Sequence, residues 1–129
     1  MARIQSVKEW RVWQRGMELA MRVFELSKKF PASERFSLTD QMRRSSRSVV
    51  ANISEAWRKR RYQAAFISKL NDAEGEAAET QTWLELALRC RYMSPADVAI
   101  LDTAYEELLA QLVHMITHCE DWTIPPLPK

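Results

Sequence analysis

At 129 residues, with 47% hydrophobic and 28% charged residues, the chain is long enough to form one domain with a buried core. Only 2 residues are Gly, which argues against a fold rich in hairpins and favours long helices. The start of the sequence lacks the apolar core of a signal peptide, and no run of about 18 uncharged apolar residues occurs, so we expect a soluble, cytoplasmic protein without a membrane span.

The small net charge of +2 conceals a strong asymmetry along the chain. Residues 1–62 carry 15 Lys and Arg against 6 Asp and Glu, whereas residues 63–129 carry 4 against 11. Two interpretations stay open at this point. Oppositely charged helices can attract one another within or between subunits, or the basic half can present a face to nucleic acid.

A first helix is predicted over about 7–29. The segment Ser6–Glu9 has the S-x-x-E form of a capping box, and the pair Phe30–Pro31 ends the helix because a residue before proline avoids helical geometry. Apolar residues cover about 200° of this helix, against the about 100° that one core face needs. We therefore expect a second buried contact, and Trp10 and Trp13 favour an interface with another subunit.

A second helix is predicted over about 38–57, because Ser37–Asp40 forms an acidic N-terminal cap. One continuous helix through the whole proline-free stretch that follows would be too long for a compact domain at about 1.5 Å per residue. We therefore predict a turn near 57–62. A third helix follows over about 62–92, with a new apolar stripe that begins at Phe66.

A fourth helix is predicted over about 95–119, because Ser94–Asp97 combines an N-cap, a proline at the first helical position and an acid in the first turn. Its apolar seam keeps the three-and-four spacing of a bundle core: Val98, Leu101, Tyr105, Leu108, Leu112, Met115 and Cys119. The Pro-rich residues 122–129 cannot extend this helix, so we expect an extended or disordered tail. The predicted fold is all-α, a single antiparallel up-down-up-down four-helix bundle over 1–129.

The segment 30–55 carries a long motif that begins with F-P-x-x-E, continues through Q-x-R-R and ends with N-I-x-E. The motif residues are Phe30, Pro31, Glu34, Phe36, Leu38, Gln41, Arg43, Arg44, Ser48, Asn52, Ile53 and Glu55. A second block over 73–87 contains two small residues, an acid and L-x-L-A. With both blocks the chain resembles the four helix bundle protein family, also called the 23S rRNA intervening-sequence protein family. Ala56 replaces the family's usual Gly, which suggests that the second helix ends slightly later or less sharply.

The resemblance implies a bundle that assembles as a ring-like homopentamer, without a family-wide enzymatic activity. Relatives include proteins encoded inside rRNA intervening sequences. They also include the accessory variability determinant of diversity-generating retroelements, which binds nucleic acid and a reverse transcriptase. We therefore predict a non-enzymatic homo-oligomer that binds RNA, single-stranded DNA or a nucleic-acid-processing protein. The alternative is a structural or regulatory protein adaptor that binds no nucleic acid.

Basic residues of the second helix and its turn form the candidate nucleic-acid surface: Arg43, Arg44, Arg47, Arg58, Lys59, Arg60, Arg61 and Tyr62. Cations can contact phosphates, and the Tyr62 ring can stack on a base. The alternative is that the arginines pair with acids of the third helix such as Glu76 and Glu79, or fix a subunit interface. The motif residues Arg43 and Arg44 favour that alternative. For 58–61, which we expect to be exposed, both interpretations stay open.

A polar row at three- and four-residue spacing lies beside the apolar stripe of the second helix: Gln41, Ser48, Asn52 and Glu55. We expect Gln41, Asn52 and Glu55 at an oligomer interface, where buried polar groups need partners. No nucleophile, His or second acid accompanies Glu55, so no catalytic site is predicted.

The sequence contains only weak indications of a metal site or of reactive thiols. His114 and His118 are one helical turn apart and can chelate a metal, but neither H-E-x-x-H nor an E-x-x-H pair is present, so no metal or other cofactor is predicted. Cys90 and Cys119 lack the spacing of a disulfide framework, and we expect both as reduced thiols packed like small hydrophobes.

Overall fold

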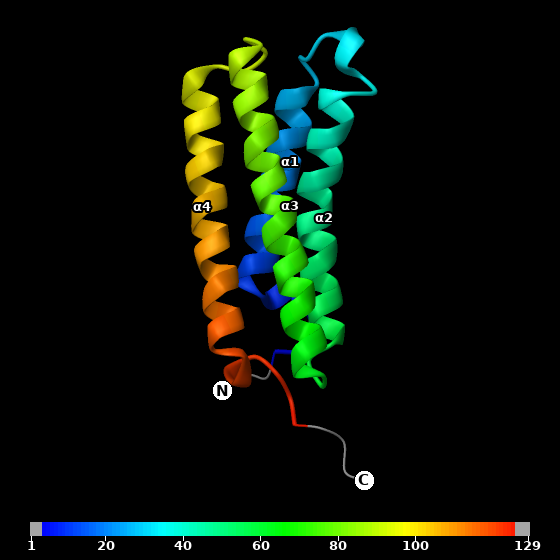
Figure 1. Ribbon diagram of the computed structural model, residues 1–129, viewed down its shortest axis with the longest axis vertical. Helices are drawn as coiled ribbons and strands as arrows, with labels where there is room; N and C mark the ends of the chain where they lie inside the picture. Colours follow the sequence, from blue (N-terminus) through cyan, green and yellow to red (C-terminus); the bar gives the residue numbers. More distant parts are fainter. Residues whose placement is uncertain (1–3, 126–129) are drawn as a thin grey trace.

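The computed structural model describes residues 4–125, which form four long helices joined by short turns (Figure 1). The helices are α1 (Arg11–Ser27), α2 (Leu38–Arg58), α3 (Gln63–Arg89) and α4 (Pro95–Thr117). Short 3₁₀ segments are η1 (Val7–Glu9), η2 (Ala32–Glu34) and η3 (Cys119–Asp121). No strand occurs within residues 4–125, which confirms the all-α class for this part of the chain. Within the same range, none of the helices has the length and apolar character needed to cross a membrane.

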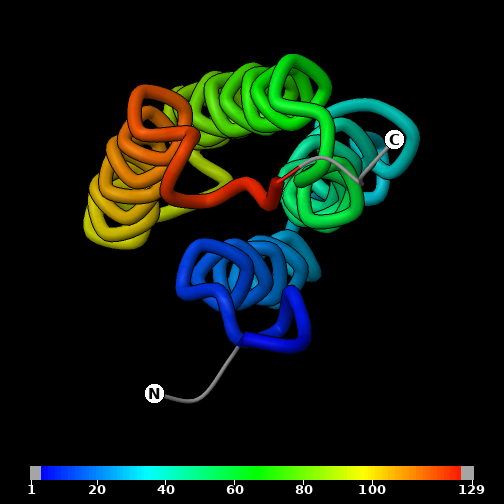
Figure 2. Tube along the Cα trace, turned by 90° about the horizontal axis from the view of Figure 1, so that it is seen from below, coloured from blue at the N-terminus to red at the C-terminus, as the bar shows by residue number. Residues whose placement is uncertain are grey.

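The four helices surround one apolar core. In Figure 1 the chain rises along α1 and α3 and descends along α2 and α4, and Figure 2 places the helices around a common centre in chain order. Fully buried aliphatic and aromatic side chains come from every helix and include Val23, Val49, Ile53, Phe66, Leu70, Leu84, Tyr105, Leu108 and Leu112. Each such side chain stabilises the fold by about 1.5–3 kcal/mol relative to exposure.

The start of the first helix differs from its prediction. The capping box of Ser6 and Glu9 is present, but it caps η1, and α1 begins only at Arg11. Between the two segments Trp10 is extended, with φ −73° and ψ 128°. This break turns the indole of Trp10 into the core, where it is 4% exposed. At the other end α1 stops at Ser27, before the predicted end at residue 29.

The α2–α3 turn and the C-terminal segment meet at one end of the bundle. Helix α2 continues past the fully buried Ala56 to Arg58, and the amide of Tyr62 donates to the carbonyl of Lys59 at 2.9 Å to close the turn. After η3 the chain crosses this end of the bundle (Figure 2), and the amide of Ile124 donates to the carbonyl of Arg60 at 3.0 Å. The rest of the predicted tail, 126–129, lies outside the described residues.

Candidate functional site

The basic residues in the first half of α2 pack against α1. The Nε of Arg43 donates to the Ser27 hydroxyl at 2.8 Å, and its guanidinium lies 4.9 Å from the centre of the Phe24 ring. Arg47 approaches the same ring at 5.8 Å. A guanidinium over an aromatic face is attracted by the ring quadrupole. Arg43 and Arg47 therefore help to hold α1 against α2.

Among residues 4–125, none of Arg43, Arg44 and Arg47 forms an ion pair with an acid of α3. For these three arginines, the predicted pairing with Glu76 or Glu79 is therefore wrong. Arg44 lies near Asp40 of its own helix at 3.9 Å. On α3, burial and the neighbouring charge of Glu79 raise the pKa of Glu76. The second part of the alternative, a subunit interface, stays a prediction.

The α2–α3 turn presents a different arrangement of basic groups. Arg58, Lys59 and Arg61 are exposed, and within the described part of the chain none of them forms an ion pair. The ring of Tyr62 beside them is 63% exposed. Three cations and an aromatic face therefore project together from this end of the bundle. We call Arg58, Lys59, Arg61 and Tyr62 the basic turn.

Arg60 does not belong to this exposed group, so the expectation that all of 58–61 are exposed is wrong. Its guanidinium lies 3.4 Å from the centre of the Trp57 ring, and its Nε donates to the Trp57 carbonyl at 2.8 Å. Because its own carbonyl accepts from Ile124, Arg60 also anchors the C-terminal segment. Arg60 thus stabilises the turn that displays its neighbours.

The polar row on α2 finds partners within the chain. The Asn52 amide donates to the carbonyl and the hydroxyl of Ser48, at 2.9 and 3.1 Å, and Glu55 forms an ion pair with Lys69 of α3 at 3.0 Å. The hydrogen bond and charge of Glu55 raise the pKa of Lys69. Gln41 is exposed. A contact of Gln41, Asn52 and Glu55 with another subunit remains a prediction.

The two predicted interface tryptophans have different environments. Trp10 packs edge-to-face on Trp57 at 4.9 Å and on Trp122 at 6.0 Å inside its own bundle. Its assignment to a subunit interface is therefore wrong, because the indole is 4% exposed and packs inside its own bundle. Trp13 is half-buried, and its Nε1 donates to the hydroxyl of Ser54 at 2.9 Å, which joins α1 to α2.

An exposed apolar face lies where α1 meets α4. Met21 and Ile100 are 50% and 60% exposed, and together with Met17 they border a groove between the two helices. The broad apolar arc predicted for the first helix includes Met17, but neither Met21 nor Ile100 was predicted. Each is a large apolar residue outside the predicted buried seam. Met21 lies one helical turn after Met17, and Ile100 borders the same groove from α4. We call Met17, Met21 and Ile100 the apolar face.

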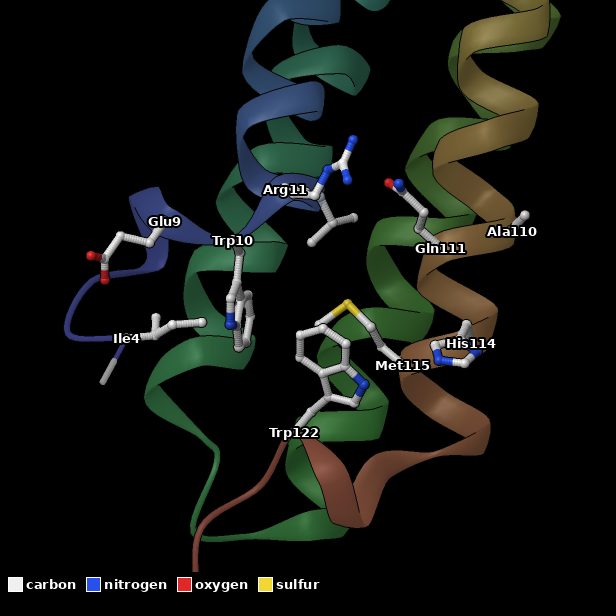
Figure 3. A pocket seen from close by; sticks show the side chains of 10 residues that line it. Ile4, Glu9, Trp10, Arg11, Ala110, Gln111, His114, Met115 and Trp122 are labelled. Atoms are coloured by element: carbon white, nitrogen blue, oxygen red, sulfur yellow. The ribbon is translucent and has the colours of Figure 1, made fainter. Parts of the chain in front are cut away.

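A pocket of about 440 Å³ lies between the start of α1 and the end of α4 (Figure 3). Its walls are largely apolar and include Trp10, Met115 and Trp122, while Arg11 and Gln111 extend toward each other across the space above them. No pattern in the sequence indicated this pocket, because Trp122 belongs to a segment outside the helical pattern and only the break before α1 brings Trp10 beside it.

Residues 8–114 match the family described as 23S rRNA-intervening sequence protein. The chain belongs to this family. A solved structure from the S23 ribosomal protein family, a protein of unknown function from Bacteroides thetaiotaomicron VPI-5482, is similar with a TM-score of 0.74 and 34% identity. The similarity covers 81% of this chain and 97% of that chain. A comparison with curated proteins finds no match. The resemblance noted from the motifs is thus confirmed.

The remaining candidate groups of this 23S rRNA-intervening sequence family member have local roles. The rings of His114 and His118 stack with centroids 4.2 Å apart, and Nδ1 of His118 lies 3.1 Å from the His114 carbonyl oxygen. Within residues 4–125, no three His, Cys, Asp or Glu side chains gather in a way that could hold a metal. Cys119 packs partly against the core, but Cys90 is exposed, so its predicted burial is wrong. Cys90 is the C-cap residue of α3 and follows its last residue.

Proposed function

We propose that this family member is a cytoplasmic, non-enzymatic protein whose up-down-up-down bundles assemble into a ring-like homo-oligomer that binds nucleic acid through the basic turn. Five subunits follow from the family resemblance. The observation that carries the proposal is the exposure of three cations, which form no ion pair within residues 4–125, beside the exposed Tyr62 ring. The family's description, which refers to 23S rRNA, agrees with a nucleic-acid ligand or with a protein partner that works on nucleic acid.

The chemistry of the basic turn suits a single strand. Lysine and arginine gain affinity by releasing counterions from phosphates, and an aromatic ring stacks on any base because every base has a π face. Three cations on one subunit bind weakly at physiological salt. A ring repeats them, and the repetition raises the effective concentration of the second contact once the first has formed. We therefore expect binding that tolerates changes of base sequence.

The apolar face supports the oligomeric part of the proposal. Monomeric proteins rarely expose adjoining large apolar side chains, and Met21 and Ile100 border one groove with Met17. Methionine adapts its shape to a partner surface because its side chain is unbranched and flexible. We propose that this face contacts the neighbouring subunit, while the basic turn at the end of the bundle stays free.

The test is binding of a fluorescently labelled single-stranded RNA, followed by anisotropy at low salt. The triple variant Arg58→Gln, Lys59→Gln and Arg61→Gln removes three charges at exposed positions and should reduce affinity at least tenfold without changing the helical signal. A matched control with the same charge change is the triple variant Lys8→Gln, Lys29→Gln and Arg35→Gln, which should retain most of the binding.

Each contrary result points to a different account. If the wild-type protein does not bind RNA or single-stranded DNA at low salt, the nucleic-acid function is refuted and the protein adaptor takes its place. If the basic-turn variant binds as tightly as the wild type, the contact surface lies elsewhere on the molecule, and the role proposed for the basic turn is refuted.

A further inference from the structure

The pocket between the start of α1 and the end of α4 has the size and composition of a small-molecule site. Its volume of about 440 Å³ falls in the usual range for such sites, about 300–1,000 Å³. Trp10 and Trp122 form part of its wall from opposite ends of the chain, and Met115 joins them from α4 (Figure 3). Apolar walls of this kind favour a ligand with an apolar or aromatic body.

The mouth of the pocket carries a positively charged side chain that can bind an anion. Arg11 is exposed and extends over the pocket opposite Gln111 (Figure 3). Among residues 4–125 Arg11 has no acidic partner within ion-pair distance. Arg15, one turn further along α1, differs because Glu18 and Glu107 hold it at 3.2 and 3.7 Å. Arg11, which borders the pocket, is thus available to an anion.

The acid that also borders the pocket does not cancel this charge. The carboxylate of Glu9 accepts hydrogen bonds from the amides of Gln5 and Ser6, at 2.6 and 3.1 Å, as the capping box of η1 requires. In Figure 3 its side chain points away from the space between Trp10 and Met115. Glu9 therefore serves the backbone, and Arg11 and Gln111 place a cation and an amide at the mouth of the pocket.

We propose that this pocket binds a small amphipathic organic anion, with its apolar body against Trp10, Met115 and Trp122 and its carboxylate or sulfonate near Arg11 and Gln111. A charge-assisted hydrogen bond to the guanidinium fixes the orientation of the ligand, and burial of its apolar body supplies most of the affinity. The site is separate from the basic turn, because no residue of that turn borders the pocket. The proposal does not depend on nucleic-acid binding.

The test uses two fluorescent probes with the same ring systems. One is 8-anilinonaphthalene-1-sulfonate, which carries an anion, and the other is N-phenyl-1-naphthylamine, which is neutral. Wild-type protein should bind both saturably, with one site per chain. Arg11→Gln should weaken the sulfonate five- to tenfold and leave the neutral probe unchanged, because an exposed arginine contributes at the lower end of charged hydrogen bonds. Arg58→Gln, with the same charge change outside the pocket, should alter neither probe.

Two substitutions at one exposed position test the location. Gln111→Trp places a large ring across the mouth and should abolish binding of both probes, whereas Gln111→Ala leaves the mouth open and should retain the neutral probe. The proposal is overturned if wild-type protein binds neither probe saturably, or if Gln111→Trp binds both as the wild type does. Equal effects of Arg11→Gln and Arg58→Gln on the sulfonate would overturn the assignment of an anion to this mouth.

Discussion

Replacement of Trp10 by alanine separates a core residue from an interface residue. The side chain is 4% exposed, and its ring centre lies 4.9 Å from Trp57, 6.3 Å from Phe66 and 6.0 Å from Trp122, each with edge-to-face geometry. Truncation of a buried Trp costs about 3–5 kcal/mol, which includes the cavity that remains. Each lost aromatic pair is worth about 0.5–1.5 kcal/mol beyond burial, so we expect the upper half of that range, about 4 kcal/mol.

Urea unfolding of Trp10→Ala, followed by far-ultraviolet circular dichroism at one fixed protein concentration, measures this loss as a lower midpoint. The matched control is Trp13→Ala, which removes a half-buried ring and one hydrogen bond to Ser54 and should cost about 1–2 kcal/mol. A Trp10→Ala variant that keeps the wild-type midpoint and instead lowers the oligomer mass would refute the core position of this residue. That result would place Trp10 between subunits.

Three other substitutions have distinct expected results. Arg60→Ala should lower the free energy of unfolding by about 1–2 kcal/mol in urea, because it removes a cation over an indole and a hydrogen bond; an unchanged midpoint would contradict this. Met21→Glu combined with Ile100→Glu should give a smaller mass by light scattering with unchanged helicity, and retention of the wild-type mass would exclude the apolar face from the subunit contact. Glu76→Gln should raise the melting temperature at pH 7, because burial and the charge of Glu79 raise the folded-state pKa of Glu76 and so disfavour its ionised form. This gain should vanish as the pH falls below about 4.5, where Glu76 is protonated in both states; a gain that is independent of pH would contradict it.

Features that depend on local sequence were predictable. The hydroxyl of Ser94 accepts from the amide of Asp97 at 3.1 Å and starts α4 at Pro95, as the N-cap and proline indicated. Six of the seven seam residues of this helix are buried, and the seventh, Cys119, follows the end of the helix and is half-buried. A spacing of three and four residues determines one helix face without reference to the rest of the fold.

Features that depend on packing between distant segments were not predictable. The capping box at Ser6 indicates a helix start, but whether it caps a 3₁₀ turn or an α-helix depends on the space that Trp57 and Trp122 leave for Trp10. Arg60 has the same charge as its neighbours in sequence, yet its guanidinium packs on the ring of Trp57, one turn earlier, and the residue is less exposed than they are. In both cases tertiary contacts override a local pattern, and these contacts cannot be predicted from the periodicity of the sequence.

The salt dependence of RNA binding tests the central claim most directly. Association of the wild-type protein with a labelled single-stranded RNA is measured by anisotropy over a series of KCl concentrations. In a plot of the logarithm of affinity against the logarithm of salt concentration, each phosphate neutralised on a single strand contributes about −0.7 to the slope. Three cations on each of two subunits therefore predict a slope of about −4. The variant with glutamine at 58, 59 and 61 should show a much flatter line. Tight wild-type binding that does not change with salt would contradict the account.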